Sequence, residues 1–478
     1  MSFKAAETSF STRPKVAIIG GGLAGLAAAE ALSRFPLEVH LWEARRSLGG
    51  RAGSYHDQSV QSWVDRCQHV AMGCCVNFIA FCKQLDLSDA FRRDKTLTFV
   101  SHDGKPYAFT ANRYLPAPLH LAGAFRRQGY LSRADKRQIT NALWQMARSP
   151  VSSAEAGWTM LHWLRQQDQG EAVIQRFWNV VLVSALGAPL DQVAYSAARK
   201  VFVDGFLRTR GAYEVLVPRV PLQEVFDHRS HAALDARGVQ ITRGKAITKV
   251  ETTGSRFRLL ANGDEAETFD SVICAAPWHQ LPKILGNGVA PHVPFLDQLA
   301  EIPTSPISSV HLWLDCPITD LPHAVILDRV SQWIFNHGRQ QIGDSQAYYY
   351  QVVISASDDL IGRGGEQIVR YVLEELHEIF PDQEQVSLVD WQVVTERKAV
   401  FSATPQTEAI RPTQATSLPG FALAGDWTAT GWPSTMEGAV RSGYLAAEAI
   451  LRKYGIDEPI LTPDPRPALL SRLFFHFQ

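Results

Sequence analysis

The sequence predicts an α/β fold in which a nucleotide-binding domain is assembled from separated segments of the chain. Three observations predict it. A glycine-rich turn lies between a strand and a helix near the start, an apolar strand ending in an acidic residue follows, and another strand–turn–helix unit occurs near the end of the 478 residues. Because such units build parallel sheets, we expect a Rossmann-like sheet with a second, α+β domain inserted.

The first unit is the apolar run VAIIGGGLAGLAAAEAL, residues 16–32. A membrane-spanning helix needs roughly 20 apolar residues, whereas this run is shorter and carries glycines that weaken a helix. It divides instead into a strand at Lys15–Ile19, a turn at Gly20–Gly25 and a helix at Leu23–Ser33. The run therefore predicts a nucleotide-binding turn and not a membrane anchor.

The turn contains the motif G-x-G-x-x-G as Gly20, Gly22 and Gly25. Its position at a strand–helix junction is the context that the motif requires. The glycines allow a tight turn, close approach of a pyrophosphate and packing of the helix on the strand. The N–H groups at the helix start, at Leu23 and Ala24, are then expected to bind the phosphates.

The second strand, LEVHLWE at residues 37–43, ends in Glu43. This residue lies about 20 positions beyond the motif, the offset at which a carboxylate binds a ribose hydroxyl. The carboxylate would repel a 2′-phosphate, which argues against NADP. Ala44 and LGGRAGS, with Gly50 and Arg51, come next. This continuation resembles the FAD fingerprint of the glutathione-reductase-like flavoproteins, especially the amine oxidase and carotenoid desaturase branch. The resemblance implies FAD as the cofactor.

Composition narrows the class of protein. The net charge of −1, without a dense basic block, disfavours nucleic-acid binding. Residues 1–13 lack the apolar core of a signal peptide and are expected to form a short frayed leader, which favours a cytoplasmic location. Six cysteines occur, four of them within residues 67–82. Their spacing matches no zinc pattern, so we expect buried thiols and no metal site.

The middle of the chain, residues 238–277, alternates apolar and polar residues between Gly and Asn turns, which is typical of a β-meander. Its last strand, Ser271–Ala275, is apolar throughout. In the flavoprotein branch named above, a segment of this kind brackets the adenine through backbone bonds, and the resemblance assigns that role to Val250. Periodicity alone favours an ordinary core position for this residue.

The last unit begins with a short apolar strand at Phe421–Ala424. Gly425 and Asp426 form the turn after it, where a carboxylate can accept hydrogen bonds from a ribose or ribityl hydroxyl. A helix starts at Met436. The N–H groups of residues 436–439 are expected to face the flavin pyrimidine and to stabilise the negative charge that develops on reduction.

One cofactor has to contact all three regions, so the nucleotide domain is predicted to be discontinuous. We predict an FAD-binding domain of residues 14–84, 209–284 and 420–455, a substrate-binding or lid domain of residues 85–208 and 285–419, and a tail of residues 456–478.

Most of residues 14–453 resembles the hydroxysqualene dehydroxylases, also called squalene-associated FAD-dependent desaturases. The chain departs from that pattern at Cys67, where glycine is usual, and at Gly187, where asparagine is usual. Both positions lie on the expected substrate side. The segments that carry the resemblance are VDRCQHVAMGCCVNF at 64–78, FWNVVLVSALGAPLDQVAYSAARKVF at 177–202, SQWIFNH at 331–337 and ERKAVFSATPQTEAIRP at 396–412.

The resemblance implies a reaction in which hydroxysqualene, an allylic C30 alcohol, loses its hydroxyl group and gains hydride from reduced FAD to give squalene. The hydroxyl leaves once it is protonated, and His69 is the candidate acid. Asp65 is expected to orient His69 or to bind the ribityl chain, and Trp432 to wall the cavity beside the flavin. An ordinary core histidine bonded to a carbonyl is an equal alternative for His69. Trp333 and Phe335 either line a channel for the C30 chain or are core aromatics.

A substrate so insoluble is expected to enter from the bilayer. Two segments mix apolar and basic residues: Arg113–Leu131, and the tail with Phe474, Phe475 and Phe477. Both are candidates for peripheral contact at the inner face of the membrane. The alternative is that they pack on the protein or on a second subunit.

Other functions fit the same fold. One is a carotenoid desaturase of the phytoene type or a flavin amine oxidase, although no clear aromatic cage for an amine is recognisable. Another is a non-catalytic FAD-binding or lipid-binding protein. The sequence leaves the oligomeric state and the electron donor open.

Overall fold

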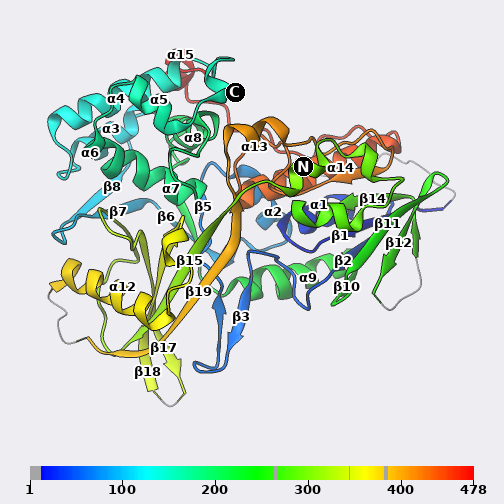
Figure 1. Ribbon diagram of the computed structural model, residues 1–478, viewed down its shortest axis with the longest axis horizontal. Helices are drawn as coiled ribbons and strands as arrows, with labels where there is room; N and C mark the ends of the chain where they lie inside the picture. The colour runs from blue at the N-terminus through cyan, green and yellow to red at the C-terminus, as the bar shows by residue number, and fades with distance from the viewer. Residues whose placement is uncertain (1–11, 263–266, 344, 382–385, 478) are drawn as a thin grey trace.

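The computed structural model describes residues 12–262, 267–343, 345–381 and 386–477. Most of the leader predicted for residues 1–13 lies outside these ranges. A parallel sheet and its helices occupy the right half of Figure 1, and a second, larger sheet with a lobe of helices above it occupies the left half. The predicted α/β class is confirmed.

The first sheet is parallel throughout and has the order β10-β2-β1-β14-β20. Strands from the beginning, middle and end of the chain therefore lie side by side, as predicted. Three of them, β1, β14 and β20, are almost wholly apolar and buried, as parallel strands covered on both faces must be. The bounds are β10 Gln240–Arg243, β2 Glu38–Glu43, β1 Lys15–Ile19, β14 Ser271–Cys274 and β20 Phe421–Leu423.

Helices α1, Leu23–Leu32, and α14, Met436–Lys453, pack against each other beside this sheet. Every residue of α1 is buried. Close approach of the two helices depends on small residues, because a Cβ atom on Gly443 would lie 2.2 Å from the carbonyl oxygen of Ala24. The small residues of the first and last motifs therefore pack against each other.

The predicted β-meander is only partly present. Strands β11 Ile247–Thr253, β12 Arg256–Ala261 and β13 Glu267–Phe269 form an antiparallel sheet of their own. The prediction is wrong for the segments on either side, because β10 and β14 belong to the parallel sheet. Their partners β2, β1 and β20 come from distant parts of the chain. The alternation of apolar and polar residues within one segment cannot indicate such partners.

The second sheet is mixed and has the order β19-β15-β18-β17-β16-β7-β8. One of its faces packs on the amphipathic helix α12, Gly365–Ile379, in the lower left of Figure 1. The bounds are β19 Leu388–Phe401, β15 Thr304–Leu314, β18 Ser345–Ser355, β17 Trp333–Ile342, β16 His323–Ile326, β7 Thr96–Val100 and β8 Pro106–Thr110.

Two small sheets join the two parts of the structure, the parallel sheet with its helices and the seven-stranded sheet with its helical lobe. A hairpin of β3 Ser54–Asp57 and β4 Ser62–Asp65 reaches toward the seven-stranded sheet. The other has the order β5-β9-β6 and pairs Ala71–Met72, Val215–Pro218 and Phe91–Asp94. It thus connects strands from both predicted domains, and the division into two domains stays a prediction.

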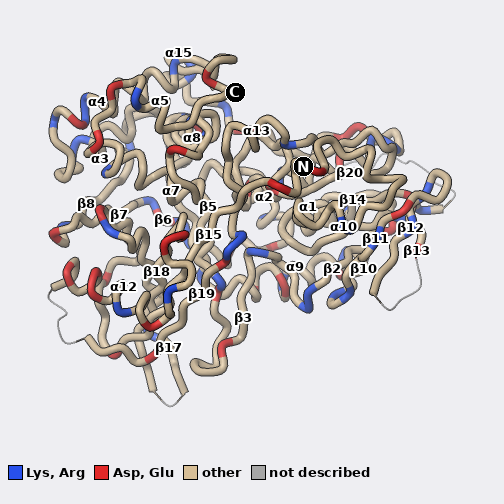
Figure 2. Tube along the Cα trace, in the orientation of Figure 1, with Lys and Arg blue, Asp and Glu red and all other residues tan. Residues whose placement is uncertain are grey.

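The helical lobe lies above the seven-stranded sheet in Figure 1. The tail folds back onto it, with α15 at its end. Within the described ranges, no helix combines the length and the apolar character needed to cross a bilayer. Figure 2 shows acidic and basic residues interspersed over both bodies. The main helices of the lobe and tail are α3 Ala122–Arg126, α4 Arg133–Arg148, α5 Met160–Gln166, η4 Ile174–Asn179, α7 Val180–Leu186, α8 Tyr195–Phe202 and α15 Leu469–Phe474.

Candidate functional site

The predicted cofactor residues meet at one edge of the parallel sheet. Gly20 follows β1, Glu43 ends β2 and Gly425 lies two residues after the end of β20. Because the strands are parallel, their carboxyl ends lie at the same edge, which is where open α/β sheets bind ligands. The fold therefore collects residues from the beginning and the end of the chain at a single crevice.

The glycine turn has room for a ligand. A Cβ atom on Gly25 would lie 1.8 Å from the carbonyl oxygen of Gly20, so this glycine is required for the helix to pack on the turn. The first neighbour of a Cβ atom on Gly22 would be Gly50 Cα at 3.9 Å, so the space beside Gly22 is left open. Gly22 is the N-cap of α1, whose first turn, Leu23-Ala24-Gly25, holds no acidic residue.

A second glycine turn lies against the first. The amide of Gly49 donates to the carbonyl oxygen of Gly21 at 2.9 Å, and a Cβ atom on Gly50 would lie 3.1 Å from Gly22 Cα. The space beside Gly22 is open, and the helix N-terminus carries no acidic side chain that would repel an anion. Both features fit the diphosphate of FAD. The residues present therefore fit FAD, the cofactor that the sequence predicts.

Glu43 holds the turn in place. Its Oε2 accepts from the amide of Gly21 at 2.6 Å, and its Oε1 accepts from the amide of Arg45 at 2.8 Å. A carboxylate oxygen has two lone pairs, so each can accept a ribose hydroxyl as well. Sequence reasoning missed the contact with Gly21. Ala44 is exposed in the bend that follows.

Arg51 joins the two ends of the chain. Its Nη2 lies 2.5 Å from Oδ1 of Asp426, and its Nη1 donates to the carbonyl oxygen of Ala399 at 2.9 Å. The hydroxyl of Ser434 donates to the other oxygen of Asp426. The buried Asp426 side chain is therefore held from two sides, with the guanidinium of Arg51 5.9 Å from the ring centre of Trp278.

The start of α14 differs from the prediction. Four free N–H groups were expected at residues 436–439. Thr435 caps the helix, however, and its hydroxyl accepts from the amide of Gly438 at 3.0 Å while its carbonyl accepts from the amide of Ala439 at 3.0 Å. This removes two of the four predicted donors and leaves the amides of Met436 and Glu437 as the candidates. In the preceding turn, the Gly425 amide donates to Ser442 Oγ at 2.8 Å.

Val250 lies in β11, fully buried, opposite Leu259. Its carbonyl oxygen accepts from the amide of Gly286 at 2.9 Å. This bond ties the strand to the segment that follows α10, Leu281–Ile284. The oxygen keeps a second lone pair, so the adenine-binding role of Val250 stays a prediction.

His69 and Asp65 occupy different hydrogen-bond networks. Nδ1 of His69 lies 2.9 Å from the carbonyl oxygen of Cys67 and therefore donates to it. Burial, reinforced by Arg51, lowers the pKa of His69, so the ring is neutral at pH 7. Asp65 accepts from Ser54 Oγ at 2.6 Å and from the amide of Leu222 at 2.8 Å, and burial raises its pKa to about 6. Its hydrogen bonds fasten the β3–β4 hairpin rather than orienting His69.

Trp432 is buried in the core of the nucleotide domain. Cations cover its ring, with Lys200 Nζ 5.0 Å and the Arg441 guanidinium 5.9 Å from the ring centre. Its carbonyl oxygen accepts from Arg411 at 2.7 Å. The tryptophan thus links the last motif to the helical lobe through Lys200.

The cysteine prediction holds for most positions. Cys74, Cys75, Cys82 and Cys274 are buried, and burial raises the pKa of Cys274 to about 12. Cys316, which lies outside the cysteine-rich segment, is exposed two residues after the end of β15. Among the described residues, no group of His, Cys, Asp and Glu forms a metal site.

Segment 65–72 packs on the face of the seven-stranded sheet that lies away from α12. Trp333 and Phe335 stack there with ring centres 5.5 Å apart, as the predicted alternating strand requires. We call their surroundings the inner apolar cluster. It consists of Leu97, Leu121, Tyr213, Val215, Val217, Phe335 and Val353, with Cys67, Val70, Met72 and Trp333 packed against them.

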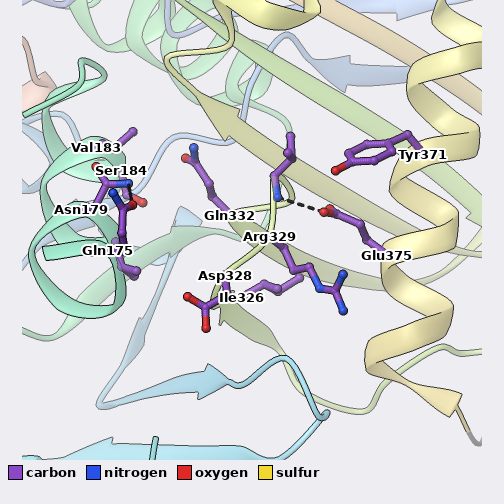
Figure 3. A pocket seen from close by; sticks show the side chains of 12 residues that line it. Gln175, Asn179, Val183, Ser184, Ile326, Asp328, Arg329, Gln332, Tyr371 and Glu375 are labelled. Carbon is purple, nitrogen blue, oxygen red and sulfur yellow. Dashed lines mark hydrogen bonds between the residues drawn. The ribbon is translucent and has the colours of Figure 1, made fainter. Parts of the chain in front are cut away.

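A pocket of about 460 Å³ opens between the helical lobe and α12 (Figure 3). Glu375 bonds the amide of Val330 on one side of it, and Ser184 accepts from Trp333 Nε1 at 3.0 Å on the other. Mostly polar side chains line it, so it does not suit the C30 chain for which the sequence predicts a channel. The lining residues are Gln175, Asn179, Val180, Val183, Ser184, Ile326, Asp328, Arg329, Val330, Gln332, Tyr371 and Glu375.

Sequence reasoning missed a group of polar and aromatic side chains beside the inner apolar cluster. The signal was available in S-S-V-H-L-W, residues 308–313, where alternation places Ser309, His311 and Trp313 on one face. Their partners on β17 and β18 are not recognisable from that segment. We call the group the polar strip, and its members are Ser309, His311, Trp313, His337, Tyr349 and Gln351.

Comparison with known proteins gives a consistent result. The sequence profile described as "Flavin containing amine oxidoreductase" matches residues 23–451. A hydroxysqualene dehydroxylase of Sinorhizobium fredii is 26% identical over 440 residues, which is 91% of this chain and 98% of that protein. A 15-cis-phytoene desaturase of Synechococcus elongatus is 24% identical over 464 residues, covering 92% and 96%. Among solved structures, an oxidoreductase of Methanosarcina mazei superposes with a TM-score of 0.68 at 16% identity, covering 92% and 100%.

Proposed function

Because this chain belongs to the flavin containing amine oxidoreductase family and is an FAD-dependent oxidoreductase, we propose that it removes the hydroxyl group of hydroxysqualene reductively and gives squalene. The observation that carries the proposal is the similarity to hydroxysqualene dehydroxylases over 91% of the chain. The inner apolar cluster, buried between segment 65–72 and the seven-stranded sheet, places apolar side chains on the expected substrate side. Such side chains suit a hydrocarbon better than a charged amine.

The reaction requires a proton and a hydride. The carbon–oxygen bond breaks, the oxygen leaves as water after it gains the proton, and the carbon gains the hydride. Bound FAD in its reduced form would supply that hydride. An external electron donor has to restore the reduced cofactor after each turnover.

In this proposal His69 delivers the proton. Its Nδ1–H is held by the Cys67 carbonyl, which leaves Nε2 as the atom that takes up a proton and passes it on. Since burial lowers the pKa of this group, it holds the extra proton weakly and gives it up readily. The proposed residues toward the cofactor are those of the crevice: the two glycine turns, Glu43, Arg51, Asp426 and Met436.

The proposal includes contact with the inner face of a membrane. In α15 the side chains of Leu469 and Leu473 are 81% and 71% exposed, whereas Ser471 is buried and bonds the carbonyl oxygen of Leu207 at 2.7 Å. A helix that turns its leucines outward suits a lipid surface. The expectation for the tail needs correction, because Phe475 and Phe477 pack on the protein core and only Phe474 is exposed.

The second segment, Arg113–Leu131, likewise combines exposed and buried apolar side chains. Tyr114 is 76% exposed and Leu119 is 48% exposed, while Leu121 and Leu131 are buried. Arg113 lies over the ring of Tyr114 at 4.6 Å and adds positive charge beside it. We propose that this loop and α15 are the parts of the protein that meet an anionic bilayer.

An anaerobic single turnover tests the reaction. The protein is photoreduced and mixed with hydroxysqualene, and flavin reoxidation is followed together with squalene formation. Equal amounts of oxidised flavin and squalene are expected, with no reoxidation when squalene itself is added. Reduced flavin that persists in the presence of hydroxysqualene contradicts the proposal.

A second candidate is desaturation of a carotenoid precursor, which the similarity to 15-cis-phytoene desaturases supports. This reaction runs in the opposite direction, since the substrate loses hydride to oxidised flavin. Mixing the oxidised protein with phytoene would then bleach the flavin. Bleaching by an amine would instead indicate an amine oxidase.

A further inference from the structure

The polar strip occupies the middle of one face of the seven-stranded sheet. Along β15 and β18, Val310, Leu312 and Val352 point toward α12 and pack in its core. Side chains alternate across a strand, so the members of the polar strip point to the opposite face, toward the nucleotide domain. Figure 1 shows β15, β17 and β18 beside α12. The strip therefore lies on the same face as the inner apolar cluster.

Its members are tightly organised. The ring of Tyr349 lies between those of Trp313 and His337, with ring centres 4.8 Å and 4.7 Å away and nearly parallel planes. The Tyr349 hydroxyl lies 2.7 Å from Nδ1 of His311. Gln351 is the cross-strand partner of His311, and its Nε2 donates to Ser309 Oγ at 2.7 Å. These contacts hold the rings of Tyr349 and His311 and the amide of Gln351 in place.

Two of these atoms are buried without a hydrogen-bond partner among the described residues. They are Nε2 of His311 and Nε1 of Trp313, whereas the side chains of His337 and Gln351 interact with each other. Buried polar atoms are nearly always satisfied, and leaving one unpaired costs free energy. Two such atoms on one small area imply that a polar group binds there.

The strip carries no net charge at neutral pH. Burial lowers the pKa of His311 to about 3 and that of His337 to about 4, and it raises the pKa of Tyr349. The nearby Asp65 carboxylate is already bonded to Ser54 and Leu222. A neutral imidazole offers one donor and one acceptor. This combination suits a neutral hydroxyl group. The charged side chains that act on the strip are Asp57 on His311, Arg92 on His337 and Asp65 on Tyr349.

Buried apolar side chains flank the strip on both sides. On one side is the inner apolar cluster. On the other, Val60 and Val64 of the β3–β4 hairpin region pack against Trp313, Tyr349 and Ala347. A ligand that satisfies both the strip and its surroundings is a long apolar molecule with a single hydroxyl group.

We propose that the polar strip binds the hydroxyl oxygen of the isoprenoid alcohol and so distinguishes this substrate from its hydrocarbon product. The inference deepens the proposed function and rests on it for the identity of the alcohol. It assigns His311, Tyr349 and Gln351 as specificity-determining residues. A site built to bond a hydroxyl group rejects an analogue that lacks it, because its polar atoms are then left unpaired.

Ligand binding to the oxidised holoenzyme tests the inference. Hydroxysqualene and squalene are titrated in the same detergent, and binding is followed by the shift of the flavin spectrum. The variants Tyr349→Phe and Gln351→Leu each remove one polar group at nearly constant size. Tyr350→Phe is the matched control, because it makes the same change one residue further on, on the face toward α12.

Wild-type protein is expected to bind the alcohol at least about tenfold more tightly than the hydrocarbon. Tyr349→Phe and Gln351→Leu should each lose most of this preference while squalene affinity and FAD content stay unchanged. Tyr350→Phe should keep it. Equal affinity of the wild-type protein for both ligands overturns the inference, as does a variant that loses affinity for both ligands alike.

The two proposals fail separately. If the wild-type protein prefers the alcohol in binding but gives no squalene in the anaerobic turnover, the reaction is wrong and the site stands. If squalene forms but the wild-type protein binds alcohol and hydrocarbon equally, the strip holds only water and the reaction stands. Should Tyr349→Phe fail to retain FAD, the wild-type preference and Gln351→Leu still decide the question.

Discussion

Arg51 and Asp426 lie 375 positions apart in the sequence, and Nη2 of the arginine is 2.5 Å from Oδ1 of the aspartate. The pair joins the second glycine turn to the loop after β20. Because these two segments flank the crevice at the carboxyl edge of the parallel sheet, the pair sets the distance between the two halves of the cofactor site.

Arg51→Ala is therefore expected to weaken FAD binding by roughly tenfold to a hundredfold, since it leaves the buried Asp426 without its positive partner. The flavin-to-protein ratio after purification and the affinity of the apoprotein for added FAD measure the effect. Arg176→Ala, which breaks the exposed ion pair with Asp328, is the control and should change neither quantity. Unchanged flavin content in Arg51→Ala would remove the pair from the cofactor site.

The contact between α1 and α14 gives a second prediction. A Cβ atom on Gly443 would lie 2.2 Å from the Ala24 carbonyl oxygen and 3.0 Å from Ala27 Cβ, so Gly443→Ala must push the helices apart. Overpacking of this kind lowers the free energy of unfolding by about 1–3 kcal/mol. Thermal unfolding of the apoprotein measures it. Gly364→Ala, where a Cβ atom meets nothing within 4 Å, serves as the comparison and should leave the unfolding temperature unchanged.

Sequence reasoning succeeded where structure is set locally. The strand at Lys15–Ile19, the helix start at Leu23 and the strand after residue 420 follow from short patterns of apolar residues and glycines, and the structure has them at those positions. It failed where structure depends on distant partners. β10 joins the parallel sheet because β2 is its neighbour, and no feature of residues 240–243 records that pairing.

The same limit applies to the site. The glycine turns and Glu43 were recognisable because their spacing is fixed by local geometry. The polar strip was not, because Tyr349 and His337 become its members only when β18 and β17 pair beside β15. The hydrogen bond from the amide of Leu222 to Asp65 was also not recognisable, since the two residues lie 157 positions apart. Binding of the ribityl chain by Asp65 stays a prediction.

Stability should depend on pH through His120. Burial lowers the pKa of this histidine to about 4, below the roughly 6.5 of an unfolded chain. Between these values the unfolded state binds more protons than the folded state, so stability falls as pH drops from about 6.5 toward 4. Acidification from pH 7 to pH 5 should cost about 1–2 kcal/mol from this group.

His120→Phe removes that contribution, so its loss of stability between pH 7 and pH 5 should be smaller than that of the wild-type protein. Denaturant unfolding at both pH values gives the difference. The same substitution at the exposed His102 should retain the wild-type dependence. Parallel pH profiles for wild type and His120→Phe would show that His120 is not held neutral in the folded state.

The outward face of α15 is tested with vesicles of phosphatidylcholine and phosphatidylglycerol. Replacing Leu469 and Leu473 together by Ser should reduce co-sedimentation roughly tenfold or more, because two leucine side chains no longer enter the lipid. Folding should be unaffected, since both side chains are largely exposed. Serines at Ile361, just before α12, and at Val389 of β19 are the matched control, because both side chains are exposed. Full binding by the α15 variant would assign the membrane contact elsewhere.

The proposed proton transfer from His69 predicts how the reaction rate depends on pH. Burial and Arg51 lower the pKa of this group below its usual range, so the protonated fraction at neutral pH is small and grows as pH falls. The single-turnover rate of hydroxysqualene reduction should therefore rise on going from pH 8 to pH 6. His69→Gln keeps a polar side chain but cannot titrate; it should react about a hundredfold more slowly and with a flat profile. Flavin content must stay at the wild-type level for the comparison to count. A rate and profile identical to those of the wild-type protein would show that the proton comes from another donor and that His69 is a core histidine bonded to the Cys67 carbonyl.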